Sequence, residues 1–410
     1  MRPLAASFFK RGEEMATSDT GIDQSTSIPF YRDERIINWI AQIVSAVLVI
    51  GFLIWVVVNF LAAADARGFS LGFNFLNDPA GFPINDPGIE YDPSMTYGRA
   101  ILVGLVNTLR VAIAGVVAAT ILGTTVALAR LSPNWLLSRI ALVYIEFHRN
   151  IPLLVLLFIW YFSVFTQLPP VRESLVLPGP VILNLRGLYI SWPRLTETGG
   201  PLAIALIIGI VLATIAYFVL RRRREETGQE TYYGWVSLAI VVVSAIGGWL
   251  VSGGTPLYLD VPVLDGFNYA GGLRLTPEFA ALFVGLTMYT AGFIAEVVRA
   301  GIQAVDRGQV EAANAVGLSN LQVLSLVVIP QALRVIIPPM ISQYLNLTKN
   351  SSLALAIGYQ ELFSVGRIAI NQAGQAVPVF AIIMVSYLTL SLLTSAVLNV
   401  YNRRIQFVTR

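Results

Sequence analysis

The sequence predicts an all-α protein, a polytopic bundle of about eight transmembrane helices. Two observations support this prediction. Of the 410 residues, 56% are hydrophobic and 12% are charged, whereas soluble domains contain about 45–50% apolar and about 25% charged residues. The apolar residues also form runs long enough to cross a hydrocarbon core of about 30 Å, and polar segments separate these runs.

Eight apolar runs are candidates for membrane spans. They are residues 39–61, 107–129 (with an amphipathic lead-in from residue 97), 141–165, 201–220, 235–251, 277–300, 323–347 and 378–401. The seventh is expected to be broken by Pro330 and Pro338-Pro339, since proline lacks a backbone N–H. Residues 62–96 are expected to be a loop of coil, because NDPAGFPINDPG at 77–88 is rich in turn-forming residues.

Composition excludes several kinds of chemistry. The chain has no cysteine and one histidine, His148, so a disulfide, a thiolate site or a multi-histidine metal site is not expected. The net charge of +3 is small and does not indicate a nucleic-acid partner. Residues 1–38 are polar and contain no apolar core of a signal peptide, so no cleavable signal is expected.

The positions of lysine and arginine predict the orientation in the membrane, because cytoplasmic loops carry an excess of both. With the N-terminus inside, the inner segments hold 18 of the 27 lysines and arginines and the outer segments hold 8. The turn at 221–224 consists of four arginines, which makes this orientation hard to reverse. Both tails, residues 1–38 and 403–410, are therefore expected in the cytoplasm, together with segment 306–322.

Segment 306–322 carries its own helix start and stop signals. Asp306, with Gln309 three residues later, predicts a helix N-cap with a capping-box partner. Gly317 is placed for a left-handed C-terminal cap after a helix of about ten residues. Ser319 and Gln322 repeat the capping pattern and predict the start of a second helix.

The first of these helices has features of a docking element. Ala312 and Ala313 give it a small-residue face on which another protein could approach closely, and Glu311 adds a charge. From the spacing alone, the helix either inserts into the groove of another protein or rests on lipid headgroups as an amphipathic helix.

The residue types in this segment resemble a known loop. The segment resembles the EAA loop of membrane subunits of ATP-binding-cassette importers. The matching residues are Glu311-Ala312-Ala313, then Gly317, then Pro330 at the end of residues 327–330. One departure is Val327, where the family more often has isoleucine. The resemblance implies a coupling helix that inserts into a cytoplasmic ATPase. The implied coupling residues are Gln309, Glu311, Ala312, Ala313, Gly317 and Pro330.

The resemblance extends to membrane subunits for polar amino acids of the histidine/glutamine permease type. The matching residues are 107–109, Glu146, 149–154, 295–302, 308–309, 330–334, 338–339 and 349–353. The implied five-span core of a type I importer covers 97–165 and 277–402. The first span, 39–61, the loop 62–96 and two spans in the insertion 166–276 are additional. This pattern closely resembles the long Q-type membrane subunit of general L-amino-acid transport systems.

The resemblance implies a translocation subunit in a bacterial inner membrane. Its implied partners are ATPase subunits, a second homologous membrane subunit forming a heterodimer, and a periplasmic amino-acid-binding protein. ATP and Mg would be bound by the ATPase, and this chain would bind no cofactor and catalyse no reaction. Consistent with this, neither Lys10 nor Lys349, the two lysines, lies in a P-loop motif.

Two other classes of protein would also have membrane-spanning helices. A self-sufficient proton- or sodium-coupled secondary transporter could use Glu296 or Glu146 as its proton site, but it would need inverted repeats, and no convincing repeat is found. A membrane enzyme is not expected, since the chain lacks metal ligands, cysteine and a histidine-based dyad.

Polar residues at membrane depth are candidates for the substrate pathway. Glu296 and Arg299 share a helix face and could either pair with each other or bind a zwitterion. Arg110 is expected to reach toward the interface, and His148 to be a polar interface residue. Three candidates near the middle of the sixth span either form hydrogen bonds between helices or line a polar pocket: Thr287, Tyr289 and Thr290. Five candidates follow the expected break in the seventh span and could line the pathway or an outer gate: Asn346, Lys349, Asn350, Ser351 and Ser352.

Overall fold

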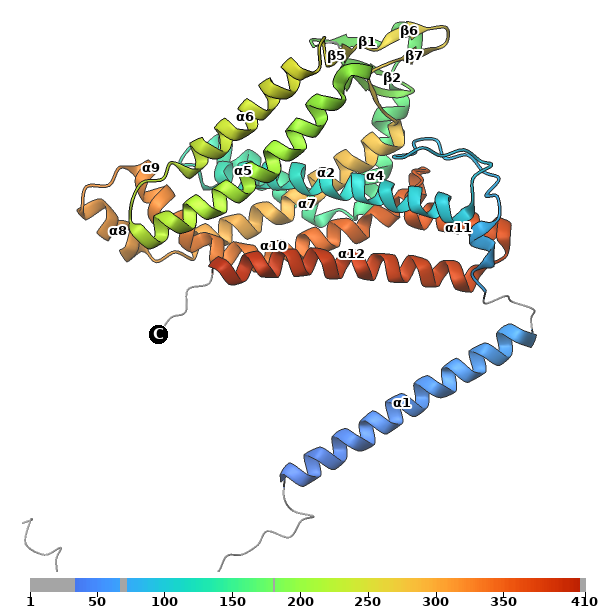
Figure 1. Cartoon of the computed structure of the whole chain (residues 1–410). Coiled ribbons are helices and arrows are strands. Elements are labelled where there is room, and N and C mark those ends of the chain that lie inside the picture. Colours follow the sequence, from blue (N-terminus) through green and yellow to red (C-terminus); the bar gives the residue numbers. More distant parts are fainter. Residues whose placement is uncertain (1–33, 67–71, 180, 406–410) are drawn as a thin grey trace, which may run out of the picture. The chain divides into compact units, whose positions relative to one another are not determined.

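The computed structural model describes residues 34–66, 72–179 and 181–405. The expected tails therefore lie largely (1–38) or mostly (403–410) outside the described residues. The chain divides into two units, residues 1–70 and 71–410, which are considered separately. Both are mainly helical, which confirms the predicted fold class (Figure 1).

The first unit contributes one long helix, α1 (Glu34–Ala66). Its stretch Ile37–Ala63 has a mean hydropathy of 2.7, and none of its most apolar window is buried within the unit. A helix of this length exceeds the roughly 20 residues needed to cross a bilayer. The first expected span, 39–61, is thus confirmed as a helix of membrane-spanning length and composition.

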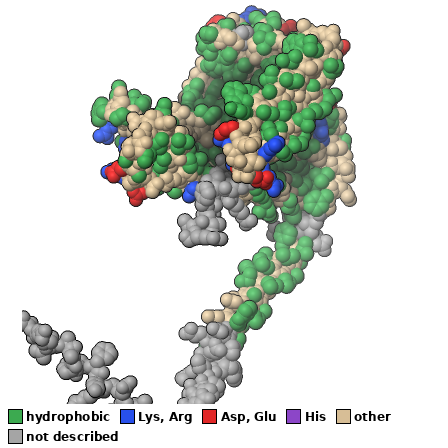
Figure 2. Space-filling view, turned by 60° about the vertical axis from the view of Figure 1, so that its left-hand side comes forward, with side chains coloured by type: hydrophobic (Ala, Val, Ile, Leu, Met, Phe, Trp, Pro, Cys, Tyr) green, Lys and Arg blue, Asp and Glu red, His purple; other side chains and the backbone are tan. Residues whose placement is uncertain are grey.

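The second unit is organised around α7 (Pro277–Gln303), whose apolar window is 61% buried. It packs against α2 (Tyr97–Leu131), α3 (Trp135–Asn150) and α10 (Ile329–Asn350). Its Leu282, Leu286 and Ile294 are fully buried in the main core. Hydrophobic side chains also cover much of the visible outer face of the bundle, which fits contact with lipid (Figure 2).

The third expected span is bent rather than straight. The described residues contain seven helices that could cross a membrane, or eight if α3 and the following segment are one span. That segment is α4 (Leu153–Phe158), continued by the π-helix η2 (Ile159–Val164) and the 3-10 helix η3 (Phe165–Gln167). It meets α3 at 107°. The bend follows from Pro152, because the residue before a proline avoids the helical region. Ile151 is accordingly extended, with φ −97° and ψ 133°.

The prediction that Pro338 and Pro339 break the seventh span is wrong. The span starts with α9 (Asn320–Gln322) and the wide turn η6 (Val323–Val328), after which α10 runs through Pro338 and Pro339 without interruption. Prolines are tolerated in membrane helices because neighbouring groups and local adjustments satisfy the freed backbone carbonyls. The helix changes instead after Asn350, where the 3-10 helix η7 (Ser351–Ile357) begins.

The insertion contains strands that the sequence analysis did not predict. Its helices α5 (Gly200–Thr227) and α6 (Tyr233–Val251) form an antiparallel pair. Short antiparallel sheets flank this pair: one of four strands in the order β1-β2-β3-β8, and two of two strands, β4-β5 and β6-β7. The strands are Leu175–Leu177, Val181–Asn184, Gly187–Ile190, Trp192–Leu195, Leu257–Asp260, Val263–Asp265, Asn268–Ala270 and Leu273–Leu275 for β1 to β8.

The two ends of the second unit differ. One end carries α8 (Arg307–Ala315), α9 and the α5–α6 turn, and the opposite end carries the strands and residues 72–96 (Figure 1). As expected, residues 72–96 are mostly coil, with the short 3-10 helix η1 (Asn74–Asn77). They nevertheless form a second core, in which Phe75 and Phe82 pack with α2, α11 (Leu362–Ala373) and α12 (Ala376–Ile405). The amphipathic helix α11 was not predicted.

Candidate functional site

The local structure of segment 306–322 follows the predicted caps, except that Asp306 and Gln309 make a backbone bond in place of the predicted capping box. The carboxylate of Asp306 accepts a hydrogen bond from the backbone N–H of Gly308 at 2.6 Å, and Gln309 donates its backbone N–H to the Asp306 carbonyl. Gly317 has φ +85°, a left-handed conformation that favours glycine. Ser319 and Gln322 form the predicted capping box. The expected helix of about ten residues has nine, Arg307–Ala315.

The expected small-residue face is wrong for Ala313. This residue is 6% exposed and packs against Val323 and Val328 of η6. Ala312 is exposed, because successive residues of a helix point about 100° apart and the two alanines therefore do not share a face. We call the exposed set the α8–α9 surface; it consists of Gln309, Glu311, Ala312, Val316 and Leu321. Val316 and Leu321 are 77% and 78% exposed, so this surface presents large apolar side chains as well as the Glu311 carboxylate.

The α8–α9 surface is firmly attached to the bundle. Leu318 donates its N–H to the Ala313 carbonyl at 3.2 Å, which closes α8 onto the following turn. The apolar cluster beneath α8 joins it to η6, and η6 continues directly into α10, where Pro330 is exposed near the first turn. Through this cluster and the continuous chain, α8 is linked to α10, which packs against α7 and α12.

A second group of candidates surrounds a hollow between α3, α7 and α10. Glu296 and Arg299 form an ion pair, as the simpler of the two expectations had it, and Arg299 also donates to Gln303 at 2.6 Å. Arg149 lines the same hollow of about 260 Å³, and its guanidinium carbon lies 5.6 Å from the ring centre of Phe293. The structure thus places a cation and a carboxylate from different helices at one largely apolar hollow.

Candidates in the middle of α7 lie inside the bundle. Thr287 and Thr290 are 7% and 3% exposed, and the Thr287 hydroxyl makes no hydrogen bond among the described residues. Tyr289 is half-buried, with its ring 5.0 Å from that of Phe293. These side chains therefore belong to the packed interior of the second unit.

Candidates at the end of α10 follow a continuous helix, which corrects the expected setting. Asn346 and Lys349 are exposed and Asn350 is half-buried. Ser351 and Ser352 donate their hydroxyls to the carbonyls of Thr348 and Lys349 at 2.7 and 2.8 Å. Both serine hydroxyls thus help to end the helix.

His148 and Arg110 have definite partners. His148 is 5% exposed, and its Nδ1 lies 2.9 Å from the Tyr144 carbonyl, consistent with a polar interface residue. Arg110, expected to reach toward the interface, forms an ion pair at 3.3 Å with Asp86 of the loop before α2 and lies over the Phe279 ring.

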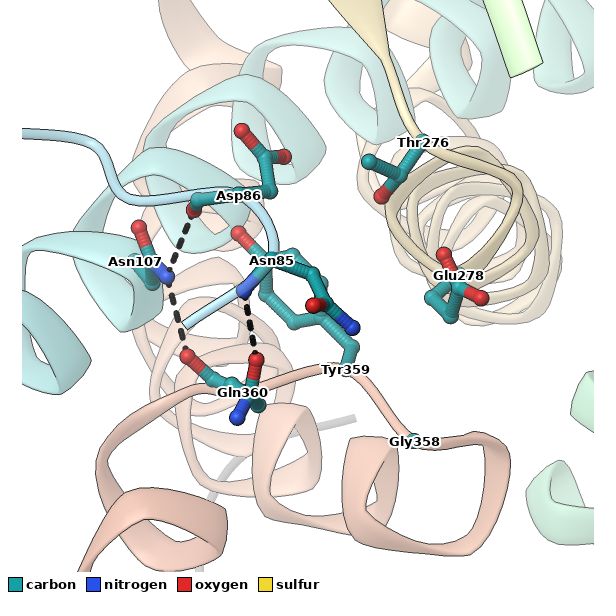
Figure 3. Close-up of a pocket in the computed structure, with 8 residues that line it drawn as sticks. All are labelled: Asn85, Asp86, Asn107, Thr276, Glu278, Gly358, Tyr359 and Gln360. Atoms are coloured by element: carbon teal, nitrogen blue, oxygen red, sulfur yellow. Dashed lines mark hydrogen bonds between the residues drawn. The ribbon is translucent and has the colours of Figure 1, made fainter. Parts of the chain in front are cut away.

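The sequence analysis missed a hydrogen-bonded cluster around the start of α11. The side-chain amide of Asn107 donates to the carbonyls of Asp86 (3.0 Å) and Gln360 (2.9 Å), and its oxygen accepts from Gly88 N–H (3.0 Å). The side chain of Gln360 accepts from Asn85 N–H at 2.7 Å (Figure 3). Residues more than 250 positions apart are thereby tied together. We call this cluster, with Glu361 described next, the α11 joint.

Glu361 is the fully buried charge of the α11 joint. Its carboxylate caps α11 by accepting from the backbone N–H groups of Phe363 (3.0 Å) and Ser364 (2.8 Å), and it also accepts from Tyr387 Oη (2.7 Å) and Thr108 Oγ1 (3.3 Å). Burial raises the pKa of Glu361 above its ordinary value, although these donors act in the opposite direction. A glutamate before an apolar pair is a weak sequence signal, so the partners could not have been found without the fold.

No group of three or more His, Asp or Glu side chains within the described ranges is arranged to hold a metal ion. The membrane-spanning bundle and the exposed α8–α9 surface instead suit a membrane subunit of a transport system. The family described as "Binding-protein-dependent transport system inner membrane component" matches residues 115–407, more than half of the chain. The chain belongs to this family, and the resemblance drawn from its motifs is confirmed.

Three relatives cover nearly the whole chain. It is 46% identical to the general L-amino acid transport system permease protein AapQ of Rhizobium johnstonii, over 90% of this chain and 92% of that protein. It is 44% identical to the putative amino-acid ABC transporter permease protein YhdX of Escherichia coli, over 91% and 95%. It is 37% identical to the glutamate/glutamine/aspartate/asparagine transport system permease protein BztB of Rhodobacter capsulatus, over 92% and 96%.

Proposed function

We propose that this chain is the translocation subunit of an ATP-binding-cassette importer for general, polar L-amino acids. The names of its full-length relatives support the substrate class, and its family supports the role of a membrane subunit. In this role the chain is a non-catalytic permease, and partner ATPase subunits bind ATP and Mg and hydrolyse the ATP.

The observation that carries the coupling proposal is the α8–α9 surface. Val316, Leu321 and the Glu311 carboxylate are all exposed on this segment, and the element beneath it continues into α10. An exposed apolar patch with a polar rim is typical of a protein interface. Docked in an ATPase groove, α8 would pass ATPase closure to α10 and switch the bundle from inward- to outward-open.

The remaining partners and the orientation are proposed from the family and the charge pattern. A second homologous membrane subunit would complete a heterodimer, and a periplasmic binding protein would deliver the amino acid. The α8–α9 surface and the arginines at 221–224 lie at the same end of the second unit, which supports a cytoplasmic position for both (Figure 1). The protein would reside in a bacterial inner membrane with both termini in the cytoplasm.

The hollow with Arg149 and Glu296 is the better candidate for part of the substrate pathway. A zwitterion needs a cation for its carboxylate and an anion for its ammonium group. The hollow offers Arg149 beside an apolar wall, and an ammonium group at Glu296 would compete with the Arg299 ion pair. The other proposed pathway residues are Thr287, Tyr289, Thr290, Arg299, Asn346, Lys349, Asn350, Ser351 and Ser352.

The test compares two glycines that differ only in their position. Gly317 (φ +85°) ends α8 and Gly228 (φ +69°) ends α5, and a Cβ added at either meets no atom within 4 Å. Valine at each site would bear a similar backbone strain of about 1–2 kcal/mol. We expect Gly317→Val to lower ATP-dependent amino-acid uptake in reconstituted vesicles by about tenfold or more. ATP hydrolysis should persist, and the complex should stay folded. Gly228→Val should leave uptake near the wild-type rate.

Either of two results would contradict the proposal. Normal uptake by Gly317→Val would show that the turn does not transmit ATPase closure. Uptake that is driven by an ion gradient and needs no ATPase would instead indicate a secondary transporter, which the family membership does not favour.

A further inference from the structure

A small cavity lies beside the α11 joint, and polar side chains make up much of its lining. It is lined by the loop before α2, by Asn107, by the start of α7 and by residues 358–360 (Figure 3). The volume of the cavity is about 10 Å³. This is close to the smallest space that holds one water molecule, so a single small occupant fits.

Two polar atoms of the lining residues lack partners. The hydroxyl of Tyr359 and Oδ2 of Asp86 are buried and make no hydrogen bond among the described residues. Tyr359 is 2% exposed, and burial together with the nearby Asp86 carboxylate raises its pKa, so its hydroxyl is neutral at physiological pH. A buried polar group without a partner costs about 1–3 kcal/mol, so an occupant that contacts both atoms would be stabilised.

Among the described residues that line the cavity or pair with its lining, carboxylates outnumber cations by one. Asp86 and Glu278 contribute two carboxylates from different segments, and Arg110, paired with Asp86 Oδ1, contributes one positive charge. Glu278 accepts a hydrogen bond from Tyr161 Oη at 3.1 Å, which supplies no charge. One monovalent cation would balance the set.

The walls of the cavity are held in place before any ligand arrives. Asn107 bridges the loop and residue 360, and Gln360 bonds back to the Asn85 N–H and the Pro83 carbonyl. The ring of Tyr359 packs edge-on against Phe279, with ring centres 5.7 Å apart. Such a framework fixes the positions of the oxygen atoms that hard cations prefer.

We propose that this cavity, lined by Asp86, Glu278 and Tyr359, binds one compact monovalent cation. The positive charge could come from an inorganic sodium ion or, if the proposed amino-acid transport holds, from the ammonium group of a substrate whose remainder stays outside the cavity. In both cases the occupant joins the loop to α7 and to the start of α11.

The experiment measures the midpoint of thermal unfolding of the whole complex purified through this chain. Sodium chloride or methylammonium chloride replaces N-methylglucamine chloride at constant ionic strength, with no amino acid present. We expect the wild-type midpoint to rise and saturate with one of the two compact cations. Saturation with sodium indicates an inorganic ion, and saturation with methylammonium alone indicates a site for substrate ammonium groups.

Two variants and a control test the assignment. Tyr359→Phe removes a hydroxyl that makes no hydrogen bond among the described residues, and Glu278→Gln removes a carboxylate charge. Each should weaken cation binding and so raise the half-saturating cation concentration by about tenfold, which corresponds to about 1.4 kcal/mol. Asp92→Asn removes an exposed carboxylate of the same loop, outside the cavity lining, and should keep the wild-type response.

The result that overturns the proposal is an equal, unsaturated response to all three salts in every protein. The cavity would then hold a water molecule or nothing, and an empty cavity would make Tyr359→Phe more stable in every salt, because an unsatisfied hydroxyl is removed. ATP-dependent uptake by the same preparations reports separately on the proposed function.

Discussion

The two ends of the second unit are built on opposite principles. The α8–α9 surface rests on local hydrogen bonds, such as that between Asp306 and Gly308, and exposes large apolar side chains. The α11 joint depends on hydrogen bonds between residues about 250 positions apart, and its central charge, Glu361, is fully buried. The first arrangement leaves a surface free for a partner, and the second holds the chain's own segments together.

This difference separates stability from function. Changes in the α11 joint should destabilise the chain itself, because they leave buried polar groups without partners. Changes on the α8–α9 surface should leave the fold intact and affect only what binds there. We expect four changes to differ accordingly, from the largest effect on stability to the smallest.

The largest loss of stability is expected for Glu361→Ala. The variant would leave the N–H groups of Phe363 and Ser364 and the Tyr387 hydroxyl without their acceptor. We expect a loss of about 3 kcal/mol in the free energy of unfolding, measured as a lower thermal midpoint in detergent. Glu225→Ala, at an exposed ion pair on α5, is the control and should change stability by less than about 0.5 kcal/mol. Equal midpoints for both variants would show that the α11 joint does not hold the fold.

A smaller loss is expected for Asn107→Ala. It removes hydrogen bonds to Asp86, Gly88 and Gln360, and we expect a cost of about 2 kcal/mol. Because the loop is anchored through these bonds, the amides of residues 82–90 should exchange hydrogen faster while those of α7 stay protected. Asn314→Ala, on exposed α8, is the matched control. Unchanged exchange in the loop would mean that the apolar contacts of Phe75 and Phe82 suffice to anchor it.

The next effect depends on pH and arises from Glu361. Burial raises its pKa from the ordinary 4.5, so between pH 4.5 and the raised value the folded chain holds a proton that the unfolded chain has released. The stability contributed by this group is therefore present below pH 4.5 and is lost as the pH rises through the raised pKa, by about 1.4 kcal/mol per pKa unit. Thermal midpoints measured from pH 4.5 upward should fall more steeply for the wild type than for Glu361→Gln. Parallel profiles would indicate that the hydrogen-bond donors offset the effect of burial.

The same contrast explains what could be predicted from sequence. Membrane spans follow from composition, and the caps at Asp306, Gly317 and Ser319 follow from local residue patterns, so both were predicted well. The burial of Ala313 was not, because it depends on where η6 folds back beneath α8. The predicted break at Pro338 is wrong for a related reason, because the surroundings of a membrane helix decide whether a proline interrupts it.

The α11 joint could not be predicted for a different physical reason. Asn107 was identified as part of a motif, and Asp86 lies in a turn-rich loop, but neither residue indicates its partner. Their bonds to residues 360 and 110 are set by the packing of α2 against α11 and by the return of the loop onto α2. The strands of the insertion are similarly short, and their pairing joins segments on both sides of α5 and α6.

The smallest effect on stability, with a large effect on assembly, is expected for Leu321→Asp. Leu321 is 78% exposed, so a carboxylate there stays solvated and should change the free energy of unfolding by less than about 0.5 kcal/mol. In a groove of the ATPase, however, the same charge would be buried without a partner. We expect this variant to lose the ATPase on co-purification while its own thermal midpoint is kept. Tyr232→Asp, on the exposed turn between α5 and α6 at the same end, should retain the ATPase. Loss of the ATPase from both variants would indicate a general effect of negative charge at this end, and retention by both would place the docking site elsewhere.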